Sequence, residues 1–303
     1  MAATFSEEKG TNMRANHHRF VAFAYVVREG SFSAAATRLC VTQSAVTQHV
    51  AKLEKQVGSP LLLRDREGVK LTRTGRELYD LADRMVTLDT AITERLEGFE
   101  AMERGHIRII ANAPLPALRA ISQFRQTHPD VEIEFSLYDW TTATRFLRER
   151  RADVGLITDP PKSDEWERVP VQKVHYVAYL LPSSPLSNRD GLSLRDLAQE
   201  TLILPENGSL TERVVREALE AHGINFQRTI KMATFPLMCE AVLQGAGIAI
   251  FLSNSGLISR GLVQVPVVEL SGEHETAVVA PKDRSGLRLV SAFIEIASSS
   301  NFS

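Results

Sequence analysis

The sequence predicts an α/β protein in three parts: an N-terminal part dominated by α-helices, one long linker helix and a two-lobed C-terminal part. Three observations predict this fold class. Residues 17–57 carry helical periodicity, residues 74–104 carry the longest unbroken helical pattern, and residues 106–303 alternate between strand-like apolar runs and amphipathic helices. A chain of 303 residues that is 44% hydrophobic can bury more than one core.

Residues 31–72 predict two helices joined by a tight turn. Ser31 or Ser33 can cap a short alanine-rich helix that ends near Leu39, and residues 40–41 form the turn. Thr42 can cap the helix that follows, and Gly58 can end it in the left-handed conformation. A further helix over residues 17–29 supports this pair.

The helix predicted over residues 42–57 has two unlike faces. An apolar stripe at spacings of 4, 3 and 4 consists of Val46, Val50, Leu53 and Val57. The opposite face carries amide, hydroxyl and ammonium groups and no carboxylate, on Ser44, Thr47, Gln48, Ala51 and Lys55. Amides, hydroxyls and methyls are the groups that recognise base edges in a major groove, so this helix is predicted to bind DNA.

The residues after Gly58 predict a hairpin, with strands at 61–64 and 69–71 around a turn at 65–68. Together these elements predict a winged helix-turn-helix. Base contacts are predicted for Gln43, Ser44, Thr47 and Gln48, with Ala51 allowing a close approach. Phosphate contacts are predicted for Lys52, Lys55, Arg64, Arg66, Lys70 and Arg73, and Ser33 and Thr42 complete the predicted DNA-binding set.

At these residues the chain resembles the LysR-type transcriptional regulators. The resemblance rests on Gly30-Ser31-Phe32, Ala34-Ala35-Ala36, Leu39, Gln43-Ser44-Ala45-Val46-Thr47, Leu53-Glu54, Gly58, Leu61-Leu62, Arg64 and Leu71-Thr72-x-x-Gly75. It is dense over residues 18–76 and looser through residue 298. The family usually has phenylalanine where Leu62 stands, which is a conservative difference. The resemblance implies a regulator that binds double-stranded promoter DNA and responds to a small-molecule effector.

The charge distribution is compatible with DNA binding, although the net charge is -2. Residues 33–76 contain eight basic and three acidic residues, a balance of +5. Residues 77–103 contain two basic and eight acidic residues, a balance of -6. A basic head is therefore followed by an acidic helix, and only the head has to meet phosphate.

The long helix carries an apolar seam at spacings of 3, 4, 3, 4, 4 and 3. Its members are Leu78, Leu81, Met85, Leu88, Ile92, Leu96 and Phe99. Such a seam on a charged helix predicts pairing with a second copy, because little of the helix can pack on its own domain. The resemblance implies the same dimer, with a tetramer as a further step. Gly105 is expected to end the helix and act as a hinge.

The C-terminal part predicts strands at 107–110, 131–138, 154–157, 174–181, 201–204, 229–233, 248–251, 263–267 and 277–280. Helices are predicted at 115–128, 141–151, 192–198, 210–222, 236–244 and 286–297. This order resembles the family's effector domain, which has a periplasmic-binding-protein-like fold. The resemblance implies a crossing between lobes near Pro170 and a return near Val267.

The expected domains follow from these assignments. They are a flexible extension at 1–16, the DNA-binding domain at 17–73, the linker and dimerisation helix at 74–105, and the effector-binding domain at 106–303, with lobe I at 106–169 and 267–303 and lobe II at 170–266.

Ligands of parallel α/β lobes bind beyond the carboxyl ends of the strands. By that rule the predicted effector contacts are Asn112, Pro114, Thr141, Thr142, Thr158, Ser209, Thr211, Thr234 and Phe235. Helix N-termini with hydroxyl groups favour a carboxylate or similar anion. Because the set contains no Arg or Lys, a polyanionic ligand is not expected. Each Ser or Thr can equally be a plain helix cap, and the loop at 111–116 replaces a Ser or Thr that the family often has there.

Several other classes of protein are disfavoured. No metalloprotease, nucleophile-elbow or phosphate-loop motif occurs, so no catalytic residue, metal or cofactor is predicted. Two cysteines 199 positions apart and no signal peptide suit a reducing, cytoplasmic location. Cys239 is interpreted as a packing residue, with redox sensing as the alternative. The remaining alternatives are an exported solute-binding protein and an α/β protein whose N-terminal part contacts another protein.

Overall fold

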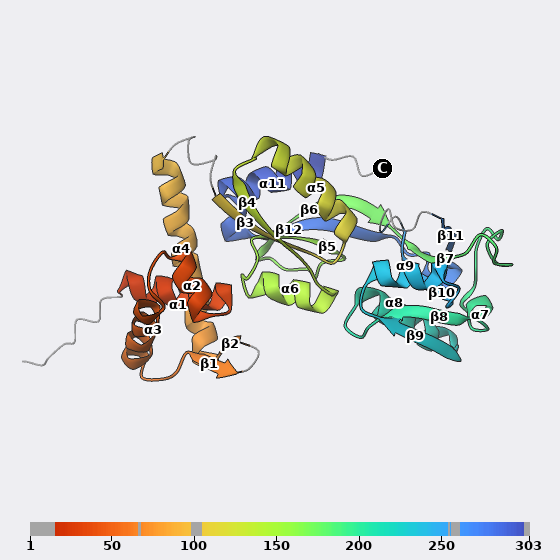
Figure 1. Ribbon diagram of the computed structural model, residues 1–303, viewed down its shortest axis with the longest axis horizontal. Coiled ribbons are helices and arrows are strands. Elements are labelled where there is room, and N and C mark those ends of the chain that lie inside the picture. Colours follow the sequence, from red (N-terminus) through yellow and green to blue (C-terminus); the bar gives the residue numbers. More distant parts are fainter. Residues whose placement is uncertain (1–15, 66–67, 98–104, 254, 256–260, 300–303) are drawn as a thin grey trace, which may run out of the picture. The chain divides into compact units, whose positions relative to one another are not determined.

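A computed structural model describes residues 16–65, 68–97, 105–253, 255 and 261–299 of the chain. Its contacts divide the chain into two compact units, residues 1–89 and 90–303 (Figure 1). The extension predicted at 1–16, apart from Asn16, lies outside the described residues, as do Arg66 and Phe99. Within the described part, every helix is too short or too polar to cross a membrane.

The first unit contains the predicted winged helix-turn-helix. Its elements are α1 (His17–Glu29), α2 (Phe32–Arg38), α3 (Gln43–Val57), β1 (Leu62–Asp65), β2 (Gly68–Leu71) and the start of α4 (Arg73–Glu97). β1 and β2 pair antiparallel, with Leu62 opposite Leu71, and form the wing. The predicted fold class is confirmed in this unit.

Local hydrogen bonds explain where α2 and α3 begin and end. The Ser31 hydroxyl accepts from the N–H of Ala34 at 3.0 Å, so Ser31 and not Ser33 caps α2. The Thr42 hydroxyl accepts from the N–H of Ala45 at 3.2 Å and caps α3. Gly58 ends α3 at a φ of 78°, a left-handed conformation that glycine adopts without strain. The polar residues in the sequence therefore fix both helix boundaries.

The core of the first unit buries one face of α3. Val46, Val50 and Leu53 are at most 2% exposed and pack with Phe23 and other side chains of α1 and α2. Val57, which was predicted to continue the stripe, is 38% exposed. That prediction was wrong because Val57 lies in the last turn of α3, beyond the turns that this core covers.

An ion pair joins α1 to α4 in the first unit. The Arg28 Nε atom lies 2.5 Å from Oδ1 of Asp83, whose side chain is fully buried. A second nitrogen of Arg28 donates to the Asp83 carbonyl at 3.3 Å and to the Thr87 hydroxyl at 3.4 Å. Because a buried carboxylate without its partner is costly, this contact fixes the start of α4 against α1.

The second unit contains two five-stranded sheets. The first sheet has the order β4 (Val131–Leu137), β3 (Gly105–Ala111), β5 (Val154–Thr158), β12 (His274–Pro281) and β6 (Trp166–Val174). The second has the order β11 (Val263–Pro266), β7 (Tyr176–Leu180), β10 (Ile248–Leu252), β8 (Thr201–Pro205) and β9 (Arg228–Met232). We call the parts built on the first and second sheets lobe I and lobe II.

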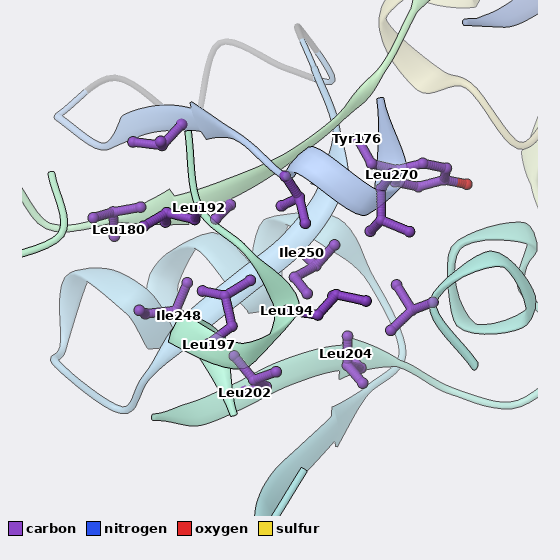
Figure 2. Packing of buried hydrophobic residues seen from close by; sticks show 14 of the residues in the cluster. Tyr176, Leu180, Leu192, Leu194, Leu197, Leu202, Leu204, Ile248, Ile250 and Leu270 are labelled. Carbon is purple, nitrogen blue, oxygen red and sulfur yellow. The ribbon is translucent and has the colours of Figure 1, made fainter. Parts of the chain in front are cut away.

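Helices cover both sheets. They are α5 (Pro114–Thr127), α6 (Trp140–Arg148), α7 (Leu194–Leu197), α8 (Leu210–His222), α9 (Phe235–Leu243), η3 (Val268–Leu270), α10 (Lys282–Ser285) and α11 (Arg288–Ser299). Figure 2 shows the apolar core of lobe II, where Leu194 and Leu197 of α7 lie among Leu202, Leu204 and Ile250 of the sheet. Each lobe has its own apolar clusters, and the described residues form two in lobe I and two in lobe II.

Strand β6 was not predicted, and it moves the crossing between the lobes. Pro170 lies inside β6 and pairs with Ala277, so the chain leaves the first sheet at His175 and not near Pro170. The strand escaped prediction because charged residues and a proline interrupt its apolar pattern, which an edge strand tolerates. The return lies later than the predicted Val267, because Val267 and Leu270 still pack in the core of lobe II and the chain rejoins the first sheet at His274, where β12 begins.

Gly105 differs from its predicted role as the residue that ends the linker helix. It is the first residue of β3 and pairs with Val131 of β4. A Cβ atom at this position would lie 2.5 Å from Cδ1 of Leu289, so a larger residue would require the Leu289 side chain of α11 to move. Residues 98–104, where the predicted helix would end, lie outside the described residues.

We predict that Asp83→Ala destabilises the first unit by about 3–5 kcal/mol, because it leaves the Arg28 charge without its buried partner. Hydrogen exchange of peptides from α1, measured by mass spectrometry, reports this unit without interference from the second. Glu77→Ala is the matched control, since it removes a carboxylate from α4 whose contact with Arg73 is exposed to solvent. Equal exchange in the two variants would contradict the prediction.

Candidate nucleic-acid interface and effector cleft

The outward face of α3 presents the predicted base-contacting side chains. Gln43, Ser44, Gln48 and Ala51 are exposed. Thr47 is half-buried, and its hydroxyl donates to the Gln43 carbonyl at 2.9 Å. Its proton is therefore used within the helix, and the methyl group and the oxygen lone pairs remain for a base edge.

The one carboxylate of α3 is held away from this face. Oε1 of Glu54 accepts from the N–H of Leu61 at 2.8 Å and from the N–H of Leu62 at 3.2 Å. These bonds attach the end of α3 to the beginning of the wing. They also engage the negative charge that would oppose DNA phosphates.

The structure describes the side chains of most, but not all, of the predicted phosphate-contacting residues. Ser33, Thr42, Lys52, Lys55, Lys70 and Arg73 are exposed. Arg64 stands opposite Val69 in the wing, but its side chain and all of Arg66 lie outside the described residues. Arg19 of α1 was not among the predicted residues, but its guanidinium donates to Oε1 of Gln56 at 3.0 Å and so places a further positive charge beside α3. No periodicity on α1 indicates that contact.

The second unit contains a cavity of about 340 Å³ between lobe I and lobe II, and six of the nine predicted effector contacts line it. These are Asn112, Pro114, Ser209, Thr211, Thr234 and Phe235. Oδ1 of Asn112 accepts from the N–H of Thr158 at 2.9 Å, which leaves the amide NH₂ group for a ligand. The ring of Phe235 stacks on that of Phe251, with 4.6 Å between the ring centroids, and the pair forms an apolar wall.

The other three predicted residues do not line this cavity. The Thr141 hydroxyl donates to the Gly208 carbonyl at 3.0 Å and connects the two lobes. The N–H of Thr142 donates to Oδ1 of Asp139, which caps α6. Thr158 is fully buried, and its hydroxyl lies 2.8 Å from that of Thr276. Thr158 lines a smaller pocket between the lobes together with Asn112 and Pro114. A role of these three threonines in effector binding therefore stays a prediction.

The charged residues of the cavity were missed by the sequence analysis. Asp139 and Glu206 line it, together with Trp140, Tyr138, Asn207 and Leu210. None of the described lining residues is Lys or Arg. Arg213 of α8 is close by, but its guanidinium lies 4.4 Å from the centre of the Trp140 ring and does not line the cavity. The formal charge of the described lining is therefore negative.

The helix N-termini at the cavity differ in their donors. Pro114 is the part of α5 that lines the cavity, and proline has no N–H group. Leu210 and Thr211 begin α8 and Phe235 begins α9, so their N–H groups have no partner within the helix. Thr234 precedes α9 without capping it through its side chain. Anion-binding donors are thus concentrated in lobe II.

Comparison with known proteins identifies both parts of the chain. Residues 17–76 match the model of the bacterial regulatory helix-turn-helix protein, lysR family, and residues 100–300 match the LysR substrate binding domain. The chain belongs to the LysR family of transcriptional regulators. The LysR-type DNA-binding function and the family resemblance predicted from the sequence are confirmed, and the family consists of regulators, not enzymes.

Curated relatives include other LysR-type regulators. The regulator CfxR of Cupriavidus necator is 30% identical over 241 residues, which cover 78% of this chain and 76% of CfxR. The probable regulator LrrA of Synechococcus elongatus is 32% identical over 236 residues, which cover 75% of this chain and 77% of LrrA.

Solved structures show the same fold. A full-length OxyR variant from Pseudomonas aeruginosa has a TM-score of 0.78 at 16% identity and covers 96% of this chain and 97% of its own. Full-length CbnR, solved in complex with its target DNA, has a TM-score of 0.51 at 18% identity and covers 93% of this chain and 98% of its own.

In this LysR-type chain, α4 presents two apolar sides. Tyr79, Ala82 and Val86 are at most 4% exposed and pack in the core of the first unit. The exposed side consists of Leu81 at 65%, Leu88 at 62%, Ile92 at 50% and Leu96 at 81%. Leu78 and Met85 are half-buried at its edge. Contrary to the prediction, α4 covers part of its own domain through Tyr79, Ala82 and Val86, but Leu81, Leu88, Ile92 and Leu96 of the predicted seam are exposed.

The cysteines of this LysR-type regulator differ in environment. Cys239 on α9 is fully buried among Tyr179, Phe235 and Met238, and burial raises the pKa of its thiol to about 11. Cys40, at the turn between α2 and α3, is exposed. Because the thiolate is the reactive form, Cys239 has the properties of a packing residue.

We predict that Cys239 stays unmodified when the native protein is exposed to mild peroxide. A thiol with a pKa raised to about 11 is almost entirely protonated at pH 7, and its reactivity increases only as the pH approaches that value. Peptide mass spectrometry measures the modified fraction, with the exposed Cys40 as the internal control. Oxidation of Cys239 at or above the level of Cys40 would favour redox sensing.

Proposed function

We propose that this LysR-type regulator binds promoter DNA as a homodimer in the cytoplasm, with α3 of each subunit in a major groove. The observation that carries the proposal is the outward face of α3, where amide, hydroxyl and methyl groups are exposed and Glu54 is bound to the wing. Gln43, Ser44, Thr47 and Gln48 contact base edges. The solved complex of CbnR with its target DNA supports this arrangement by analogy.

Phosphate contacts come from the residues around α3 and the wing. Lys52 and Lys55 extend from α3, Lys70 from β2 and Arg73 from the start of α4. Ser33, Thr42, Arg64 and Arg66 complete the proposed set. These contacts position the helix in the groove and supply the salt-dependent part of the affinity, whereas the base contacts supply the sequence preference.

The exposed stripe of α4 is the proposed dimer contact. Leu81, Leu88, Ile92 and Leu96 repeat along one side of the helix, and two copies can bury them against each other. Pairing fixes the separation of two α3 helices, so that the dimer recognises half-sites about 10 base pairs apart or at a multiple of that distance. Two such dimers form the proposed tetramer.

A small metabolite that carries a carboxylate is the proposed effector. It binds in the cavity between lobe I and lobe II, where the N–H groups and hydroxyls of lobe II favour an anion. Such a ligand changes DNA binding only if its affinity differs between two arrangements of the protein. A head that contacts another protein is the rival, and binding to duplex DNA in a mobility shift discriminates between the two.

We predict that Gln43→Ala relaxes the sequence preference, because each lost base contact costs about 1–3 kcal/mol of discrimination.

We predict that Lys55→Ala instead weakens binding to all duplexes alike and reduces the slope of log K against log salt by about one, because it removes a phosphate contact. Fluorescence anisotropy with a duplex selected from a random pool, and with a scrambled duplex, measures both effects. Arg119→Ala removes an exposed charge from α5 and is the control. If neither Gln43→Ala nor Lys55→Ala changed DNA binding, the proposed DNA interface on α3 would be disproved.

We predict that Leu88→Asp raises the dissociation constant of the dimer at least 100-fold, because it places two carboxylates in an apolar contact. Sedimentation equilibrium measures the constant. Leu88→Met preserves an apolar side chain of similar size and is the control. Since Leu88 is 62% exposed within the chain, circular dichroism of the two variants should agree. A dimer unaffected by Leu88→Asp would exclude this side of α4 as the contact.

A further inference from the structure

Two kinds of charge-binding groups line the cavity between the lobes. Lobe II contributes the Ser209, Thr211 and Thr234 hydroxyls and the free N–H groups at the starts of α8 and α9. Lobe I contributes Asp139 from the start of α6, and Glu206 of the loop before α8 adds a second carboxylate. Ligands with only negative charge satisfy the first set and are repelled by the second.

The two carboxylates are available to a ligand. Oδ1 of Asp139 accepts one hydrogen bond, from the N–H of Thr142 at 3.0 Å. No described residue forms an ion pair with Asp139 or with Glu206, and both side chains are exposed to solvent. A cation that enters the cavity therefore meets acceptors with free lone pairs and displaces no protein base.

Lobe II has a buried hydroxyl pair, Thr211 and Tyr176. Thr211 lines the cavity and is 3% exposed. The Tyr176 hydroxyl lies beside it, fully buried, and makes no hydrogen bond of ordinary geometry with a described residue. Burial raises the pKa of Tyr176, so the phenol stays protonated and remains a donor. If the Thr211 hydroxyl donated its proton to a bound carboxylate, the Thr211 oxygen could accept a hydrogen bond from the Tyr176 hydroxyl.

The rest of the wall is apolar. Phe235 and Phe251 stack in lobe II, and Pro114 and Leu137 line the cavity from lobe I. The volume of about 340 Å³ is at the small end of the range of about 300–1,000 Å³ for small-molecule sites. This space suits a single compact molecule with an apolar side chain.

We propose that the effector is a zwitterion: an α-amino acid with an apolar side chain, its carboxylate on the hydroxyl and N–H groups of lobe II and its ammonium group near Asp139 and Glu206. The proposal rests on the proposed function of the cavity as an effector site. Asp139 and Glu206 are then the residues that determine specificity, because they distinguish an amino acid from the corresponding acid without an amino group. A phosphorylated metabolite is disfavoured by the same two charges.

Isothermal titration calorimetry on the full-length dimer tests the proposal. The probes are the twenty common L-amino acids, the matching carboxylic acids without the amino group, such as 3-phenylpropanoate, and the matching amines without the carboxylate, such as 2-phenylethylamine. We expect at least one apolar amino acid to bind, and both of its truncated relatives to bind at least 10-fold more weakly.

The double variant Asp139→Asn and Glu206→Gln provides the matched comparison. Asparagine can still cap α6 through its oxygen, so the fold is preserved, and unliganded DNA affinity checks this. We expect the variant to bind the amino acid at least 10-fold more weakly than the natural protein does. Its affinity for the matching carboxylic acid without the amino group should not fall.

Two outcomes overturn the proposal in distinguishable ways. Equal affinity of the natural protein for the amino acid and its acid would reject the zwitterion and preserve the carboxylate effector. Binding by neither class would reject both.

Discussion

Burial of one face of α3 is the constraint on which the rest of the DNA-binding part depends. Val46, Val50 and Leu53 occupy the core formed with α1 and α2, and this fixes the rotation of the helix about its axis. The outward position of Gln43, Ser44 and Gln48 follows from that rotation. The hydrogen bonds of Glu54 then join the helix to the wing, so that recognition helix and wing act as one rigid surface.

The helix α4 connects that surface to the rest of the regulator because its two apolar sides serve different purposes. Tyr79, Ala82 and Val86 pack in the core of the first unit, and the ion pair of Arg28 and Asp83 adds a polar attachment. The side with Leu88 and Ile92 is exposed within the chain and is the proposed contact with a second copy. A change in how two copies pair would thus be transmitted to the recognition helices through a fixed attachment.

The cavity illustrates how backbone chemistry shapes selectivity. Proline at position 114 removes an N–H donor from the start of α5, whereas α8 and α9 retain theirs. The lobes are therefore unequal partners for a charged ligand. The Thr141 hydroxyl reaches the Gly208 carbonyl and Arg213 packs on Trp140, so direct contacts between the lobes already exist beside the cavity. Closure around a ligand can build on them.

The sequence alone determined the winged helix-turn-helix, the cap Thr42 and the two faces of α3, because these depend on local hydrogen bonds and on periodicity within one helix. It allowed Ser31 or Ser33 as the cap of α2, and the structure decided for Ser31. Only the tertiary structure decided which hydroxyls face the cavity. The hydroxyls of Thr141 and Thr158 form hydrogen bonds with Gly208 and Thr276, which are 67 and 118 positions away in the sequence. It also brought Asp139 and Glu206 to one cavity and placed β6 at a sheet edge. Contacts between residues distant in sequence leave no periodic signal, and folding alone brings them together.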